Sequence, residues 1–142
     1  MCENKRKDIP AKVKLRLWNA SAGRCQFQGC NKPLWYDGLT FECANFGEMA
    51  HIIAASKDGP RGNEKSEDLQ IDFDNLMLLC QTHHKLVDDK PEDYPVGKLK
   101  EWKKNHEERI EMLTQIQGEE YKTCLFRMLY NINERITELS DQ

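Results

Sequence analysis

The chain has 142 residues, of which 39% are hydrophobic and 32% are charged, a balance typical of a folded globular protein and not of a disordered one. No apolar run approaches the roughly 18 residues of a membrane span, and the first residues lack the apolar core of a signal peptide. A cytoplasmic protein without a membrane partner is therefore expected. Its net charge of −3 does not by itself indicate a nucleic-acid partner.

Five segments have the periodicity of regular secondary structure. Helices are predicted where apolar residues recur every three or four positions, and strands where short apolar runs are bounded by turn residues. In chain order these are a helix over 10–22, a strand over 41–53 that bends at Gly47, a strand over 75–79, and helices over 81–89 and 96–117. Between the strands, residues 54–70 are rich in glycine, serine and charge, and we expect a long exposed loop there.

The last helix and the tail that follows it suggest where the first domain ends. His106 lies on the apolar stripe of the helix over 96–117, so we expect a packed structural histidine and not a metal ligand. After Gly118 the pattern changes, and residues 121–132 look like a strand. One lone strand is not stable. We therefore predict one domain over 1–117, and over 118–142 a linker and the first strand of a second domain.

Two ligand pairs, Cys25-x₄-Cys30 and Cys80-x₂-His83, lie about fifty residues apart. Disulfides are rare in a reducing compartment, and zinc favours four thiolate or imidazole ligands held by two short pairs. The alternative is that these are buried cysteines with an incidental histidine. We favour a structural zinc ion, which would stabilise a core of this small size.

A second histidine, His84, follows the zinc pair. Adjacent helix residues point about 100° apart, so if His83 faces the zinc, His84 must face the predicted strands. His51 in AHII, Asn75 in NLMLLC and His84 in CQTHHK resemble the three signature residues of the HNH, or ββα-metal, nucleases. The runs N-L-x-x-L-C and C-x-x-(C/H)-H are the most diagnostic parts of that family, and both are present.

The resemblance implies a fold and a function. The fold is α+β: a ββα-metal finger with a structural zinc knuckle, flanked by an N-terminal and a C-terminal helix. The function is metal-dependent cleavage of double-stranded DNA. The runs GEMAHI, GPRG and YPVGKLKEWKKNHEE are most similar to the HNH domain that precedes a cyclic-nucleotide-sensing SAVED domain in antiphage (CBASS) effectors. That similarity implies a C-terminal sensor for a cyclic oligonucleotide. Because cleavage of a duplex by single-metal sites needs two of them, one per strand, we also expect activation by pairing of chains.

In the family mechanism one Mg²⁺ or Mn²⁺ ion spans the scissile phosphate and the 3′ oxygen. The resemblance makes His51 the general base and His84 a ligand of this catalytic ion. Asn75 would either bind the same ion or hold the hairpin loop that orients His51.

One position departs from the family pattern. Many members carry an Asp or His metal ligand directly before the general base, where this chain has Ala50. Glu48 lies two residues earlier, on the same side of a strand. We expect it to replace the missing ligand of the catalytic ion, the alternative being a surface carboxylate.

DNA contacts are expected from basic residues near these elements. Arg61 in GPRG could clamp a phosphate with its planar guanidinium, although a plain loop arginine is an equal alternative. Lys57 and Lys85 are weaker candidates of the same kind. Two other functions stay open: a zinc-stabilised nucleic-acid-binding module without catalysis, and a restriction-type HNH nuclease.

Overall fold

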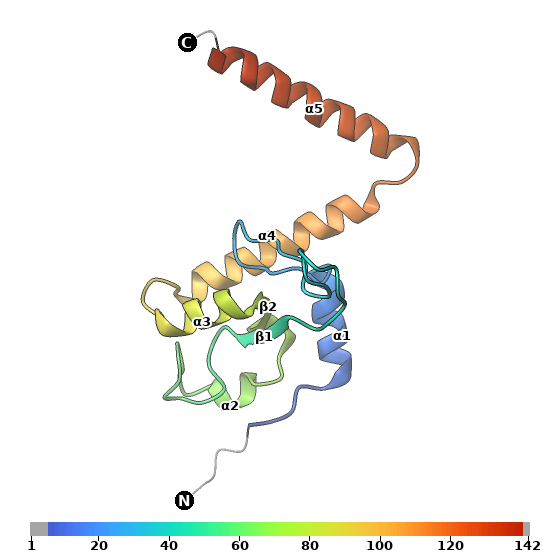
Figure 1. The fold of residues 1–142 in the computed structure, drawn as a ribbon. Helices are drawn as coiled ribbons and strands as arrows, with labels where there is room; N and C mark the ends of the chain where they lie inside the picture. The colour runs from blue at the N-terminus through green and yellow to red at the C-terminus, as the bar shows by residue number, and fades with distance from the viewer. Residues whose placement is uncertain (1–5, 141–142) are drawn as a thin grey trace, which may run out of the picture. The chain divides into compact units, whose positions relative to one another are not determined.

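A computed structural model describes residues 6–140 of the chain, which divides into two compact units, Met1–Ile110 and Glu111–Gln142 (Figure 1). Helix α1 is the first regular element of the first unit. The unit also contains two strands, and the short elements α2 and η1 lie between these strands in the sequence. The elements in chain order are α1 (Ala11–Ala20), β1 (Gly47–His51), α2 (Ser66–Leu69), η1 (Phe73–Asn75), β2 (Leu76–Cys80), α3 (Gln81–Asp89), α4 (Val96–Gln115) and α5 (Glu119–Ser140).

The centre of the first unit is a two-stranded hairpin followed by a helix. Strands β1 and β2 pair antiparallel, with Gly47 opposite Cys80 and His51 opposite Leu76. Helix α3 starts at the residue after β2, so the last β2 residue and the first turn of the helix lie together. This β–β–α order confirms the predicted α+β fold. The paired part of the first predicted strand is shorter than 41–53, because pairing begins only at Gly47.

The core forms around β2, all five residues of which are buried. Helix α1 adds Leu17 to this core, and α4 adds Leu99. His106, also on α4, is 5% exposed, and its Nε2–H donates to the backbone oxygen of Ser21 at 2.9 Å. The prediction of a packed structural histidine is confirmed. The predicted apolar stripe ends earlier than expected, since Leu113 is 47% exposed.

The segment 54–70 is more ordered than the exposed loop that we predicted. It turns back on itself through hydrogen bonds from Ala54 N–H to Pro60 O and from Gly62 N–H to Gly59 O, and it ends in the short helix α2. A Cβ atom at Gly62 would lie 2.3 Å from the backbone oxygen of Lys57, so the turn requires glycine there. The segment is therefore part of the folded unit.

The second unit corrects the prediction of a strand after Gly118. Residues Glu119–Ser140 form α5, in which no described residue is buried. The reason is the spacing of the apolar residues through this segment and the turns after it: they recur every three or four positions, at Leu125, Leu129, Ile132, Ile136 and Leu139. No helix within residues 6–140 is both long and apolar enough to cross a membrane.

Candidate active site and metal centre

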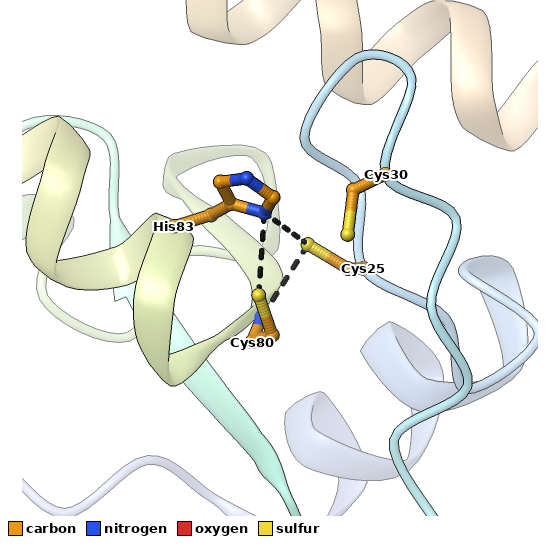
Figure 2. A group of neighbouring side chains, drawn as sticks. All are labelled: Cys25, Cys30, Cys80 and His83. Carbon is orange, nitrogen blue, oxygen red and sulfur yellow. Dashed lines mark hydrogen bonds between the residues drawn. The ribbon is translucent and has the colours of Figure 1, made fainter. Parts of the chain in front are cut away.

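Four side chains with metal-binding atoms converge beside the start of α3 (Figure 2). Cys25 and Cys30 come from the loop after α1, Cys80 ends β2, and His83 lies in the first turn of α3. Their four ligand atoms all lie within 4.8 Å of one another. The structure thus brings together the four residues that the sequence predicted as zinc ligands.

The spacing of these atoms fits a tetrahedral zinc ion. With metal–ligand bonds of about 2.0–2.3 Å, two ligand atoms of a tetrahedron lie roughly 3.3–3.8 Å apart. The Nδ1 atom of His83 lies 3.2 Å from the Cys80 sulfur and 3.7 Å from the Cys25 sulfur. Burial raises the pKa of Cys25 well above its ordinary value, although hydrogen bonds from the backbone N–H groups of Cys80 and Phe27 lower it in part. A buried cluster of thiols that disfavours negative charge in this way is stabilised as thiolates by a bound cation.

Aromatic packing fixes the direction of the histidine in this cluster. The ring of Phe27 stacks on His83 with centroids 4.0 Å apart and planes 6° apart. Trp102 of α4 in turn packs against Phe27 with its edge. The ring of His83 is therefore held toward the three sulfurs before any ion binds. Of the other cysteines within residues 6–140, Cys43 is exposed and Cys124 lies on α5, and neither belongs to the group.

His84 points away from the cluster, toward the hairpin, and lies between two carboxylates. Its Nδ1 lies 2.5 Å from Glu48 Oε2, and its Nε2 lies 3.3 Å from Asp88 Oδ2. Hydrogen bonding to Asp88 raises the pKa of His84, with a further contribution from Glu48, although burial opposes both. Glu48 is thus near the residue with which we expected it to share an ion. A hard divalent ion accepts imidazole and carboxylate ligands and keeps several waters, so this pair fits such an ion.

His51, at the end of β1, has one ring nitrogen in a hydrogen bond, whereas its other ring nitrogen forms none with the described residues 6–140. Its Nε2 lies 2.9 Å from the backbone oxygen of Gln70. Because a carbonyl oxygen only accepts, Nε2 carries the proton, and Nδ1 then has the lone pair. Burial lowers the pKa of His51, which favours this neutral form at neutral pH. His51, His84 and Asp88 line the same pocket of about 320 Å³.

Asn75 holds the segment behind His51. Its side chain is buried, accepts a hydrogen bond from Ile53 N–H at 2.8 Å, and donates to Ile53 O and Leu69 O. Asn75 thus joins the residue two positions after His51 to the residue just before Gln70. The two alternatives for Asn75 were metal binding and loop holding, and this geometry is that of loop holding.

The structure places Arg61 differently from the predicted phosphate clamp. Its side chain is 4% exposed, and its nitrogens donate to Ile52 O and Val87 O at 2.6 Å and to Asp88 Oδ1 at 2.8 Å. Arg61 has a φ of +59°, a strained value for a residue with a side chain. The guanidinium therefore joins the end of β1 to the end of α3 and is not available to a phosphate.

The two predicted lysine contacts lie at the surface. Lys57 is paired with Glu64, and Lys85 with Asp89 at 2.7 Å, and all four side chains are more than half exposed. Neither lysine lines the pocket that contains His51. Their role in DNA binding stays a prediction.

Three residues near His51 and His84 were not predicted from the sequence. Asp88 follows His84 by four positions on a helix, so the spacing alone could have indicated it. Gln70 holds His51 through its backbone, for which a sequence gives no signal. Arg6, from the segment before α1, lines the same pocket as His51.

A comparison with known protein families indicates which family the hairpin, α3 and the Cys₃His group resemble. Residues 25–90 match the family HNH_2, described as HNH endonuclease. No curated protein matches the chain. The matched segment contains the hairpin, α3 and the whole Cys₃His group. The match, the β–β–α order and the zinc-compatible cluster together support the assignment of residues 25–90 to the HNH endonuclease family.

Proposed function

We propose that this protein is a metal-dependent endonuclease that hydrolyses phosphodiester bonds of double-stranded DNA, with His51 as its general base. The observation that carries the proposal is the hydrogen bond from His51 Nε2 to Gln70 O. It leaves the lone pair on Nδ1 of a neutral imidazole, and His51 lines the pocket that His84 also lines. A positioned, neutral histidine is the group that can take a proton from water near pH 7.

The proposed reaction assigns one task to each residue. Nδ1 of His51 takes a proton from a water molecule, whose oxygen forms a bond to phosphorus while the bond from phosphorus to the 3′ oxygen breaks. His84 and Glu48 would hold a Mg²⁺ or Mn²⁺ ion, which supplies charge stabilisation for the phosphate and the leaving oxygen when bound. Asn75 orients His51 by fixing the backbone on both sides of its hydrogen bond.

The zinc ion has a structural task in this proposal. Four protein ligands close its coordination sphere, so no position is left for water or substrate. Cys25, Cys30, Cys80 and His83 would therefore hold the knuckle to the start of α3, and no chemical step uses this ion.

The test is plasmid cleavage by the purified chain with Mg²⁺ or Mn²⁺ added or left out. Omission of the ion is a better control than a chelator, because a chelator also removes zinc. His51→Ala should reduce the cleavage rate about a hundred- to ten-thousandfold, with zinc content and DNA affinity unchanged. A chain that binds DNA but never cleaves it would favour the zinc-stabilised binding module instead.

The biological setting is a further part of the proposal. We propose an antiphage effector in which a sensor for a cyclic oligonucleotide controls the nuclease, because of the similarity to the HNH domains of such effectors. The exposed apolar residues of α5 support a partner for the second unit. Fusion of the chain to an inducible dimeriser tests the idea that pairing activates it: double-strand breaks should then rise well above nicks. Full-rate linearisation by the unpaired chain, independent of protein concentration, would contradict it and would favour a restriction-type enzyme.

A further inference from the structure

The segment before α1 runs along the edge of the pocket that contains His51. Lys7 anchors it twice: its backbone N–H donates to Gln70 Oε1 at 2.7 Å, and its Nζ donates to Glu67 O at 3.0 Å. Gln70 is 2% exposed, so the first anchor is a buried amide. Ile9 packs against the core two residues later. The path of the chain around residues 6–9 is therefore fixed by the folded unit.

Arg6 lies directly before this anchor and lines the pocket together with His51, His84 and Asp88. It is exposed, and it forms no hydrogen bond or ion pair with another of the described residues 6–140. Burial is the largest cause of the lowered pKa of His51, and the positive charge of Arg6 also contributes. The guanidinium is therefore close enough to the proposed base for their charges to interact.

The three basic residues that the sequence predicted as DNA contacts do not place a positive charge in this pocket. Arg61 is buried against backbone oxygens and Asp88, while Lys57 and Lys85 are paired with Glu64 and Asp89. Arg6 is the only lysine or arginine among the described residues that line the pocket. Apart from Arg6, His51, His84, Asp88 and Gln70, the pocket wall consists of small residues of the turn over 54–60, which leave room for a ligand.

We propose that Arg6 binds a phosphate group of the DNA at the cleavage site. This inference rests on the proposed function and names a residue outside the β–β–α unit that contacts the substrate. A planar guanidinium with free donors matches a phosphate through two parallel hydrogen bonds, which a flexible lysine does not reproduce. The double anchor at Lys7 limits the freedom of Arg6, so that less conformational entropy is lost when the phosphate binds.

Two charge-matched variants test this proposal. Arg6→Gln and Lys12→Gln each remove one positive charge from the N-terminal region, but Lys12 is an exposed residue of α1 that does not line the pocket. Arg6→Gln should lower kcat/KM for plasmid cleavage about ten- to hundredfold, the effect of losing a hydrogen bond between charged groups. Lys12→Gln should stay within about twofold of the unchanged protein, and Arg6→Lys should lie between the two.

Binding measurements separate a phosphate contact from a structural effect. In a His51→Ala background, which prevents cleavage, log K for a DNA duplex is measured against log salt concentration. Arg6→Gln should reduce the magnitude of the slope by roughly 0.9, the value for one lost phosphate contact, with zinc content and urea midpoint unchanged. If the unchanged chain cleaves DNA and Arg6→Gln behaves like Lys12→Gln, the role of Arg6 is refuted while the proposed function stands. A lowered urea midpoint of Arg6→Gln would refute the phosphate contact and would indicate a structural role for Arg6. If the unchanged chain never cleaves DNA, the proposed function itself fails.

Discussion

Arg61→Met is the substitution that best separates the sequence-based and the structure-based roles of this residue. It keeps an unbranched apolar stem and removes the guanidinium, which donates to Ile52 O, Val87 O and Asp88. Breaking a buried ion pair from one side typically costs about 3–5 kcal/mol. Asp88 is 36% exposed and regains some hydration, so we expect the lower end, about 3 kcal/mol. Small domains are stable by about 5–15 kcal/mol, so the loss is a large fraction of the total.

The assay is urea unfolding followed by tryptophan fluorescence at a fixed zinc concentration. With a typical slope of about 1–3 kcal/mol per molar urea, the expected loss lowers the midpoint by roughly 1–3 M. Lys85→Met is the matched control: it breaks an exposed Lys–Asp pair at the same end of α3 and should cost at most about 1 kcal/mol. If Arg61→Met and Lys85→Met have the same urea midpoint, yet Arg61→Met abolishes DNA binding, the structural role that we assign to Arg61 is wrong. Arg61 would then bind a phosphate, as the sequence suggested.

Three further substitutions test other parts of the molecule. Cys80→Ala should lose zinc and folded structure together, because zinc ligation and folding are coupled; folded protein without zinc by elemental analysis would contradict this. Glu48→Gln should raise the Mg²⁺ concentration for half-maximal cleavage at unchanged zinc content, and an identical metal titration would show the carboxylate to be a bystander. Burial lowers the pKa of His106 in the folded chain, so acidification below about pH 6.5 favours the unfolded state. His106→Gln should remove the pH dependence that His106 causes. Between pH 7.5 and 5.5 the unfolding free energy of the variant should therefore fall less than that of the unchanged chain; parallel pH profiles of the two proteins would refute this role of His106.

The Cys₃His cluster could be predicted from the sequence because a metal site of this kind requires particular residue types at short spacings. Three cysteines and one histidine in two short pairs favour a shared metal ion, and the structure brings all four side chains together. The pairing of β1 with β2 followed from apolar runs in the same way. Helix α5 was missed because residues 121–132, taken alone, do not separate a helix from a strand, whereas the apolar spacing up to Leu139 does.

The surroundings of His51 were harder to predict because they depend on backbone atoms and on the path of a loop. Gln70 orients His51 through a carbonyl oxygen that every residue has, so no residue type marks the position. Arg61 looked like a surface cation, but it lies in the tight turn beside Gly62 and its side chain is buried. Arg6 lies forty-five positions before His51, and the hydrogen bond from its neighbour Lys7 to Gln70 was likewise not visible from spacing.

The first turn of α3 couples the zinc cluster to the proposed catalytic ion. His83 and His84 are consecutive, and about 100° of rotation separates their directions. Any rotation of the helix that keeps His84 beside Glu48 must also keep His83 on the three sulfurs, where Phe27 stacks on its ring. At its other end the same helix is held to β1 through Arg61 and Asp88. Two fixed ends leave α3 little freedom to turn. Removal of zinc from the proposed site should therefore misplace His84 and stop the proposed cleavage, although the proposed mechanism gives zinc no chemical step.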